Sequence, residues 1–254
     1  MSWTAVLLAG SRPGRDLFAE RFGTDLKALI PIAGEPMVRR PASALLATKD
    51  IGRILVLSQS PERVRDVLPQ DPRIEVLESK GTIAEAIEDL ILKKAPRFPM
   101  LVTTADHALL DPGMILEFIG KAKGADLAIG VVERRSLLEA LPQAKRTWLV
   151  FRGGAYSGAN LFALGSIKAL AAVEQWRSVE QDRKKGWRVL AALGPALLLG
   201  AVLRIRTLDQ SVASMGNRLG MDARAVVLSN PLAAVDVDKP ADHAIVEAVI
   251  ARRA

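Results

Sequence analysis

The chain has 254 residues, of which 50% are apolar and 25% are charged. This length and apolar content are enough to bury a large core, so we expect a single α/β domain over residues 1–254. The sequence contains no cysteine, which excludes disulfides, thiolate metal sites and a cysteine nucleophile. The formal net charge of +7 favours anionic partners such as nucleotides and phosphorylated metabolites. Because aromatic residues are few and no base-reading motif is present, we do not expect nucleic acid to be the partner.

The most informative segment lies near the N-terminus. An apolar run ending in Leu7-Leu8-Ala9 breaks into Gly10-Ser11-Arg12-Pro13-Gly14-Arg15. This pattern indicates a buried strand that leads into an irregular loop, where backbone N–H and guanidinium groups converge to bind phosphate. No Gly-Lys-Ser/Thr follows the glycines and their spacing is not GxGxxG, which argues against a Walker A loop and a dinucleotide-binding motif.

From this loop to residue 132, apolar runs of strand length alternate with helical segments, as is typical of a mostly parallel sheet covered on both faces. Thr82 and Glu85 have the spacing of a capping box, and Asp111-Pro112 combines an N-cap with a proline at the first helical position. We expect helices near residues 37–47, 61–68, 82–93 and 112–123, and further strands near 53–58, 74–77, 100–104 and 127–132.

The second half is less regular. Periodicity weakens over residues 133–152, which carry a basic cluster and which we expect to form a lid or acceptor-binding region. Residues 166–220 are expected to form a helical insertion that contains the apolar run 189–203, which is too short and too broken to span a membrane. Two interpretations of this run stay open: a buried helical hairpin, or a hydrophobic acceptor pocket or edge in peripheral contact with an anionic membrane. A strand at 225–228 and a C-terminal helix with an apolar face close the chain.

The N-terminal strand and loop, together with Lys27-Ala-Leu-Ile-Pro, resemble the signature of GT-A-fold nucleotidyltransferases of the MobA-like NTP transferase family. The resemblance covers roughly residues 3–132 and 154–164, and a further short segment at 234–250. It implies a three-layer α/β/α, Rossmann-like fold with a mostly parallel sheet. It also implies Mg²⁺-dependent transfer of a nucleoside monophosphate from an NTP to a phosphorylated small-molecule acceptor, with release of pyrophosphate.

The resemblance also assigns roles to residues. Arg12 and Lys27 would be catalytic, because they would offset charge on the triphosphate. Gly158-Ala159-Asn160 resembles the turn that these transferases place beside the acceptor, and Lys145 and Arg146 are the basic residues expected to hold the acceptor phosphate. The expected nucleotide-binding residues are Leu8, Ala9, Gly10, Ser11, Arg12, Arg15, Lys27, Ser58, Gly81 and Thr82.

Two carboxylates are candidate metal ligands. Asp106 follows the strand at 100–104, and ligands of open α/β sheets bind outside the carboxyl ends of the strands. An acidic residue there would repel a triphosphate unless a cation lay between them, and Mg²⁺ takes one or two carboxylates plus phosphate oxygens. The resemblance places the second ligand at Asp238. Because alternation along a strand would put Asp236 on the same face, Asp236 stays an alternative.

Two other functions stay open at this point. A GT-A glycosyltransferase would use Asp236-Val237-Asp238 as a DxD metal motif, although this motif usually lies at mid-domain rather than near the C-terminus. A non-catalytic, nucleotide-binding regulatory protein would not need both Asp106 and Asp238. The N-terminus enters a strand pattern with no secretory signal, so we expect a cytoplasmic protein. No motif in the sequence identifies the base of the NTP, the acceptor or the oligomeric state.

Overall fold

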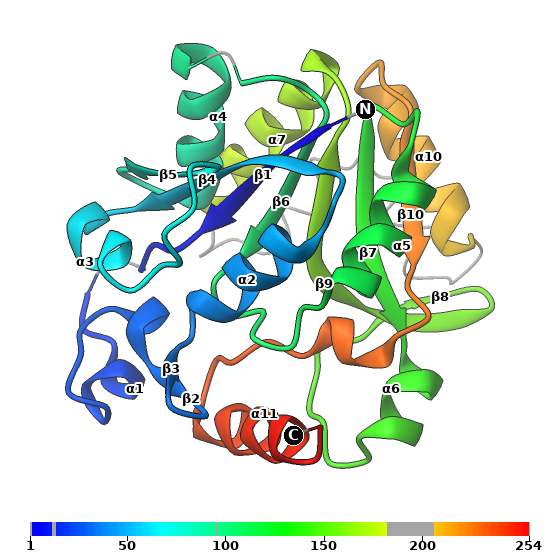
Figure 1. The fold of residues 1–254 in the computed structure, drawn as a ribbon. Coiled ribbons are helices and arrows are strands. Elements are labelled where there is room, and N and C mark those ends of the chain that lie inside the picture. The colour runs from blue at the N-terminus through cyan, green and yellow to red at the C-terminus, as the bar shows by residue number, and fades with distance from the viewer. Residues whose placement is uncertain (1, 12–13, 95, 182–205, 254) are drawn as a thin grey trace.

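The computed structural model of the protein describes residues 2–11, 14–94, 96–181 and 206–253. Within them a mixed eight-stranded sheet runs in the order β10-β7-β9-β6-β1-β4-β5, with β8 paired to β9 (Figure 1). Its pairs are parallel except for those that involve β9. The strands are β1 (Trp3–Leu8), β4 (Ile51–Ser58), β5 (Ile74–Glu78), β6 (Met100–Thr104), β7 (Leu127–Glu133), β8 (Leu149–Phe151), β9 (Gly154–Leu164) and β10 (Ala223–Val227), and a separate hairpin joins β2 (Pro31–Ile32) to β3 (Glu35–Pro36).

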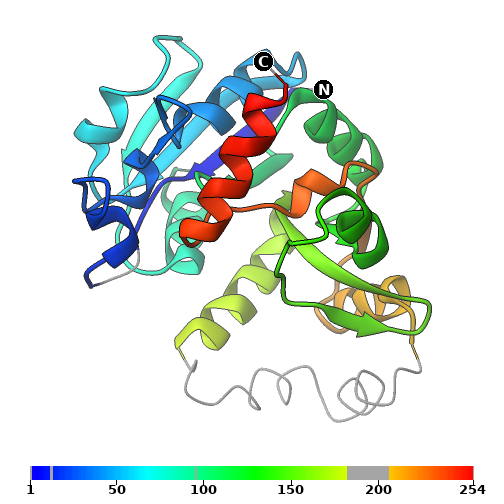
Figure 2. The same cartoon turned by 90° about the horizontal axis from the view of Figure 1, so that it is seen from below.

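Helices cover both faces of this sheet, as Figures 1 and 2 show. The α-helices are α1 (Leu17–Glu20), α2 (Arg39–Ala47), α3 (Pro61–Arg65), α4 (Ile83–Lys94), α5 (Pro112–Ala122), α6 (Arg134–Ala140), α7 (Leu170–Gln181), α10 (Leu208–Arg218) and α11 (Pro240–Ala251). Short 3-10 turns are η1 (Lys27–Leu29), η2 (Ile167–Ala169) and η4 (Pro231–Ala234). No helix in these described ranges is long and apolar enough to cross a bilayer.

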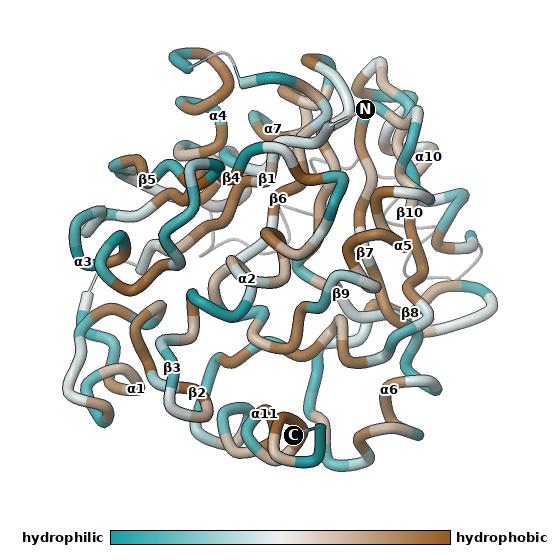
Figure 3. Tube along the Cα trace, in the orientation of Figure 1, coloured by the Kyte–Doolittle hydropathy of each residue, from teal (hydrophilic) through white to brown (hydrophobic). Residues whose placement is uncertain are grey.

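The core consists of two layers, one on each side of the sheet. Along β1, Ala5 and Leu7 point into the layer that contains α2, α5 and α11, whereas Val6 and Leu8 point into the layer that contains α4 and α7. This alternation is the period of two that a strand imposes on its side chains. Figure 3 shows the matching pattern, with hydrophobic central strands and more hydrophilic connections. The predicted three-layer α/β/α fold with a mostly parallel sheet is confirmed.

Local signals in the sequence explain how the elements begin. Thr82 and Glu85 form the predicted capping box: the Thr82 N–H donates to Glu85 Oε2 at 2.8 Å, and the Glu85 N–H donates to Thr82 Oγ1 at 3.3 Å. Asp111 caps α5 by accepting a 2.9 Å hydrogen bond from the Met114 N–H. β6 has the bounds that the sequence predicts, and β4, β5 and β7 differ from the prediction by one or two residues.

Two parts of the second half of the chain differ from what the sequence suggested, and a third lies outside the described residues. The expected irregular region at 133–152 contains α6 and β8; α6 has Leu137 as its buried residue, too little for a periodic signal. The segment that carries Asp236 and Asp238 lies between η4 and α11 and is not paired with a strand among the described residues, so the strand alternation considered for it does not apply. The apolar run at 189–203 lies outside the described residues, which resume after α7 shortly before α10.

Candidate active site

The loop after β1 lies where the carboxyl ends of β1 and β4 meet. Leu8 and Ala9 are buried and hold the loop through the backbone, with the Ala9 N–H donating to Leu57 O at 2.8 Å. The Ser11 N–H donates to Gln59 Oε1 at 2.9 Å, and Gln59 Nε2 donates back to Ser11 O at 3.3 Å. A Cβ on Gly10 would lie 2.7 Å from Gln59 Oε1, so a larger residue at this position would displace the Gln59 side chain from the loop.

Lys27 brings distant parts of the chain together at this edge. Its Nζ donates hydrogen bonds to Asp106 Oδ2 at 2.7 Å and to Asp238 Oδ1 at 2.6 Å. The Lys27 and Asp106 side chains are only 20% and 18% exposed, whereas that of Asp238 is 56% exposed. Burial by itself lowers the pKa of Lys27, but the two carboxylates outweigh it and the net shift of the pKa is upward. Lys27 is therefore a charged ammonium held between two carboxylates.

Asp106 is held through its side chain and its main chain, and Asp238 is held through its main chain. Thr104 Oγ1 donates to Asp106 Oδ1, and the Val237 N–H donates to the carbonyl oxygen of Asp106 at 3.0 Å. The Asp238 N–H donates to Asp242 Oδ2 at 3.2 Å. The closing segment before α11 is thus attached to the end of β6, which places Asp238 opposite Asp106.

The neighbouring Asp236 is turned to a different set of partners. Its Oδ1 forms an ion pair with Arg146 Nη1, Arg146 Nη2 donates to its carbonyl oxygen at 3.2 Å, and Asn160 Nδ2 donates to its Oδ2 at 3.1 Å. Asn160 has φ of +48°, a left-handed conformation that asparagine tolerates better than most residues, and it lies at the register shift in β9. Burial raises the pKa of Asp236 and the Arg146 charge opposes this rise. Because this segment is not a strand, the alternation that would have placed Asp236 and Asp238 on one face does not apply, and the two side chains have different partners.

The other predicted nucleotide-binding residues that the structure describes differ in their exposure and in their hydrogen-bond partners. Arg15 is exposed and pairs with Glu20 at 2.8 Å, so its guanidinium is already engaged. Ser58 is fully buried and its Oγ accepts a 3.1 Å hydrogen bond from the Ser60 N–H. Arg12 lies outside the described residues.

Gly81 and Thr82 stand at the start of α4. Gly81 has φ of +79°, and the Thr82 side chain is engaged in the capping box. On the opposite side of the site, Lys145 and Gly158 are exposed. The structure therefore brings together two groups, Lys27 with its two carboxylates and Asp236 with Arg146 and Asn160, and the roles of the other predicted residues stay predictions.

Several residues at this edge had no recognisable signal in the sequence. Gln59 is an ordinary polar residue after a strand, and only its contact with the loop distinguishes it. His107, which follows Asp106, is 1% exposed. Its Nδ1 lies 3.4 Å from Thr103 Oγ1, and its Nε2 has no hydrogen-bond partner among the described residues. Burial is the main cause that lowers the pKa of His107 to about 4, so the ring is neutral at pH 7.

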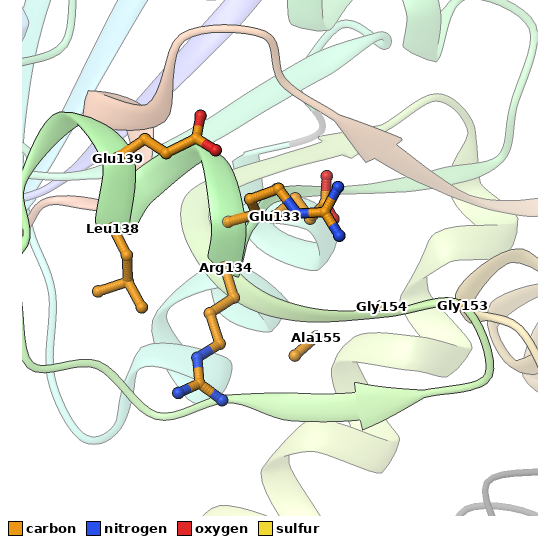
Figure 4. A pocket seen from close by; sticks show the side chains of 8 residues that line it. Glu133, Arg134, Leu138, Glu139, Gly153, Gly154 and Ala155 are labelled. Carbon is orange, nitrogen blue, oxygen red and sulfur yellow. The ribbon is translucent and has the colours of Figure 1, made fainter.

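An open pocket lies between α6 and the hairpin of β8 and β9, and its lining residues include neither Arg146 nor Asn160. Its volume is about 490 Å³. In Figure 4 the Arg134 side chain extends from α6 toward the hairpin, and its guanidinium lies 5.8 Å from the centre of the Trp148 ring. The lining residues are Glu133, Arg134, Arg135, Leu138, Glu139, Gly153, Gly154 and Ala155.

The donor set at Lys27 suits a hard divalent cation. Asp106 and Asp238 both reach one cationic nitrogen, so their oxygens can also face one metal ion. Mg²⁺ usually takes one or two carboxylates and completes its shell with phosphate oxygens and water. The described part of the chain contains no group of three or more His, Cys, Asp or Glu side chains placed to hold a metal. The two carboxylates therefore fit Mg²⁺ shared with a nucleotide.

Comparisons with known proteins identify the family and the fold. Residues 5–197 match the family model of the MobA-like NTP transferase domain. A hypothetical transferase from Thermus thermophilus is similar, with 30% identity, a TM-score of 0.82, and coverage of 96% of this chain and 100% of that chain. No curated protein sequence matches the chain.

Two less similar solved structures share the fold. CMP:2-keto-3-deoxy-manno-octonic acid synthetase complexed with CTP has 12% identity and a TM-score of 0.63, with both chains covered completely. 4-Diphosphocytidyl-2C-methyl-D-erythritol synthase from Anaerococcus prevotii has 11% identity and a TM-score of 0.61, with 99% of this chain and 96% of that chain covered. The resemblance seen in the sequence is confirmed: the chain belongs to the MobA-like NTP transferase family and is a nucleotidyltransferase of GT-A-like fold.

Proposed function

We propose that the protein transfers a nucleoside monophosphate from an NTP to a phosphorylated small-molecule acceptor, with Mg²⁺ as cofactor and pyrophosphate as the second product. The observation that carries this proposal is the contact of Lys27 Nζ with both Asp106 and Asp238, at 2.7 and 2.6 Å. One buried ammonium and two carboxylates beside a glycine-containing loop suit a triphosphate shared with a divalent cation.

The proposed reaction needs no covalent protein intermediate. An oxygen of the acceptor phosphate forms a bond to the α-phosphorus of the NTP, and the bond from this phosphorus to the oxygen that leads to the β-phosphate breaks. Lys27 donates hydrogen bonds to the triphosphate and stabilises the negative charge that grows on the departing pyrophosphate. Mg²⁺, when held by Asp106 and Asp238, supplies further charge neutralisation. The loop at Gly10 and Ser11 restrains the nucleotide beside these groups.

The acceptor side is proposed to lie at Arg146 and Asn160. Arg146 and Asn160 both hold Asp236, which fixes their polar groups in one arrangement. Lys145 adds a second positive charge for the acceptor phosphate. Because Asp236 faces Arg146 and Asp238 faces Lys27, the two carboxylates do not act as one DxD pair. This division favours nucleotidyl transfer over the glycosyltransferase alternative.

CTP is the first NTP to test as the nucleotide donor. Two of the fold relatives carry a cytidine nucleotide in their names, one as a complex with CTP and one as a diphosphocytidyl product. Their identity to this chain is low, so GTP, UTP and ATP belong in the same experiment.

Pyrophosphate release tests the proposal. Each NTP is incubated with Mg²⁺ and panels of phosphorylated sugars, alditols and cofactor precursors. We expect release with one NTP and one class of acceptor, and a fall of at least about a hundredfold in its rate in Lys27→Ala and Asp106→Asn. Asp209→Asn is the matched control, because Asp209 is exposed on the distant helix α10. Turnover in Lys27→Ala and Asp106→Asn equal to that of the control would contradict the proposal.

A further inference from the structure

His243 on α11 contacts the chain on both sides of Lys27. On the N-terminal side, its ring packs against Phe22, with ring centres 4.8 Å apart, and meets the edge of Phe18 at 6.3 Å. On the C-terminal side, its Nε2 lies 2.8 Å from the carbonyl oxygen of Pro31 in β2. Because a carbonyl oxygen only accepts, Nε2 carries the proton and donates it. One imidazole thus restrains both flanks of η1, the turn that carries Lys27.

Glu247, one helical turn further along α11, adds a second contact to the same hairpin. Its Oε1 accepts a 2.9 Å hydrogen bond from the Ala33 N–H. Ala33 has φ of +48°, which is uncommon for a residue with a Cβ and carries a conformational cost. The hairpin that follows Lys27 is therefore held in a specific shape by α11.

The same helix also fixes Asp238. Lys239 is the N-cap of α11, and Asp242 in its first turn accepts a 3.2 Å hydrogen bond from the Asp238 N–H. The start of α11 thus holds the main chain at Asp238, and the side of α11 contacts both flanks of the turn that carries Lys27. α11 therefore contacts the chain segments that carry both partners of the 2.6 Å hydrogen bond between Lys27 Nζ and Asp238 Oδ1.

We infer that His243, assisted by Glu247, is a positioning residue that sets the Lys27 ammonium for nucleotidyl transfer. This inference rests on the proposed role of Lys27. Its physical basis is the steep dependence of catalysis on geometry, since a misplacement of about 1 Å costs on the order of a hundredfold in rate. If His243 only filled space, its aromatic ring would be sufficient and its N–H group would not matter. Substitutions can separate the packing of the ring from the hydrogen bond that Nε2 donates.

Three variants separate them. His243→Phe keeps the aromatic packing and removes the donor, His243→Gln restores a donor near the Nε2 position, and Glu247→Ala removes the second contact from a side chain that is 44% exposed. We expect His243→Phe to lower kcat by at least about tenfold and His243→Gln to recover part of the loss. Ala248→Gln, at an exposed position of the same helix, is the matched control.

A double-mutant cycle with Lys27→Ala gives the sharpest kinetic test. If His243 acts through Lys27, adding His243→Phe to Lys27→Ala lowers kcat no further. Additive losses would overturn the inference and would leave the role of Lys27 standing. An unchanged kcat in Lys27→Ala alone would instead contradict the proposed function.

The reactivity of Lys27 gives a readout that needs no substrate. The Lys27 side chain is only 20% exposed and is held by two carboxylates, so an acylating reagent reaches its nitrogen slowly. In the nucleotide-free protein we expect His243→Phe and Glu247→Ala to loosen this arrangement and to raise the rate at which an N-hydroxysuccinimide ester labels Lys27, measured by peptide mass spectrometry, by at least about threefold. Lys93, which is exposed and distant, should keep its rate. Unchanged labelling of Lys27 in both variants would overturn the inference.

Discussion

Lys27 Nζ donates a 2.6 Å hydrogen bond to Asp238 Oδ1, although the two residues are 211 positions apart in the chain. Asp238 therefore reaches the N-terminal half of the site only because the segment before α11 is attached to the end of β6 through Val237 and Asp106. The lysine and the carboxylates stabilise one another in the nucleotide-free protein, and this arrangement has consequences for metal binding.

Lys27 should oppose metal binding before the nucleotide arrives. Its ammonium holds both Asp106 and Asp238 and adds a positive charge where a cation would bind. We predict that Lys27→Met raises the affinity of the nucleotide-free protein for Mn²⁺ at least about tenfold, measured by electron paramagnetic resonance of the unbound ion. Lys168→Met removes a charge that is 62% exposed at another edge and serves as the control. An affinity equal to or below that of the wild type would show that Lys27 does not compete with the metal.

Arg146 and Asp236 should be coupled in stability. Their side chains are only 12% and 22% exposed, so removing Arg146 leaves a largely buried carboxylate without its cation. We predict that Arg146→Met lowers the free energy of unfolding by about 2–3 kcal/mol, and that the double variant with Asp236→Asn recovers most of this loss. Arg53→Met, which breaks an ion pair whose side chains are about half exposed, should cost less than about 1 kcal/mol. Urea unfolding measures all three, and a double variant no more stable than Arg146→Met would argue against the coupling.

His107 should make the protein sensitive to mild acid. Burial lowers the pKa of this ring from an ordinary value of 6.5 to about 4, so the unfolded chain takes up a proton in this range before the folded protein does. The stability that neutral His107 contributes is therefore present above pH 6.5 and is lost as the pH falls toward 4. Between pH 7 and pH 4, the wild type should lose about 3 kcal/mol more unfolding free energy than His107→Gln, a difference that follows from the shift in pKa.

Urea titrations of both proteins at several pH values, in the presence of a chelator, measure this difference. Equal losses of unfolding free energy in the wild type and in His107→Gln would contradict this prediction. They would mean that the His107 ring binds its proton at the same pH in the folded and the unfolded chain.

Local signals were sufficient to predict most of the fold. Apolar runs of strand length predicted β6 to the residue, and the capping groups of Thr82 and Asp111 predicted the starts of α4 and α5. These signals depend on neighbours within about four residues, which the sequence displays directly. α6 was missed because it has seven residues and little apolar periodicity.

The site itself depends on contacts that no local pattern encodes. The family resemblance pointed to Lys27, Asp106 and Asp238. That both carboxylates contact the Lys27 Nζ follows from the strand order of the sheet and from the path of the segment before α11, which the local sequence does not encode. The sequence left Asp236 as an alternative to Asp238 because strand alternation would have put both on one face, and this segment is not a strand. His243 and Glu247 gave no signal, since a histidine and a glutamate one turn apart are ordinary on a helix surface.

A crystal structure with Mn²⁺ and a non-hydrolysable NTP analogue tests the central claim most directly, because Mn²⁺ is located by its anomalous scattering. The account predicts an anomalous peak within about 2.2 Å of carboxylate oxygens of Asp106 and Asp238, close to the distance of Mg²⁺ from its ligands. It also predicts that Lys27 Nζ has left at least one of these carboxylates for a phosphate oxygen. A bound analogue with the metal elsewhere, and Lys27 still bridging Asp106 and Asp238, would contradict it.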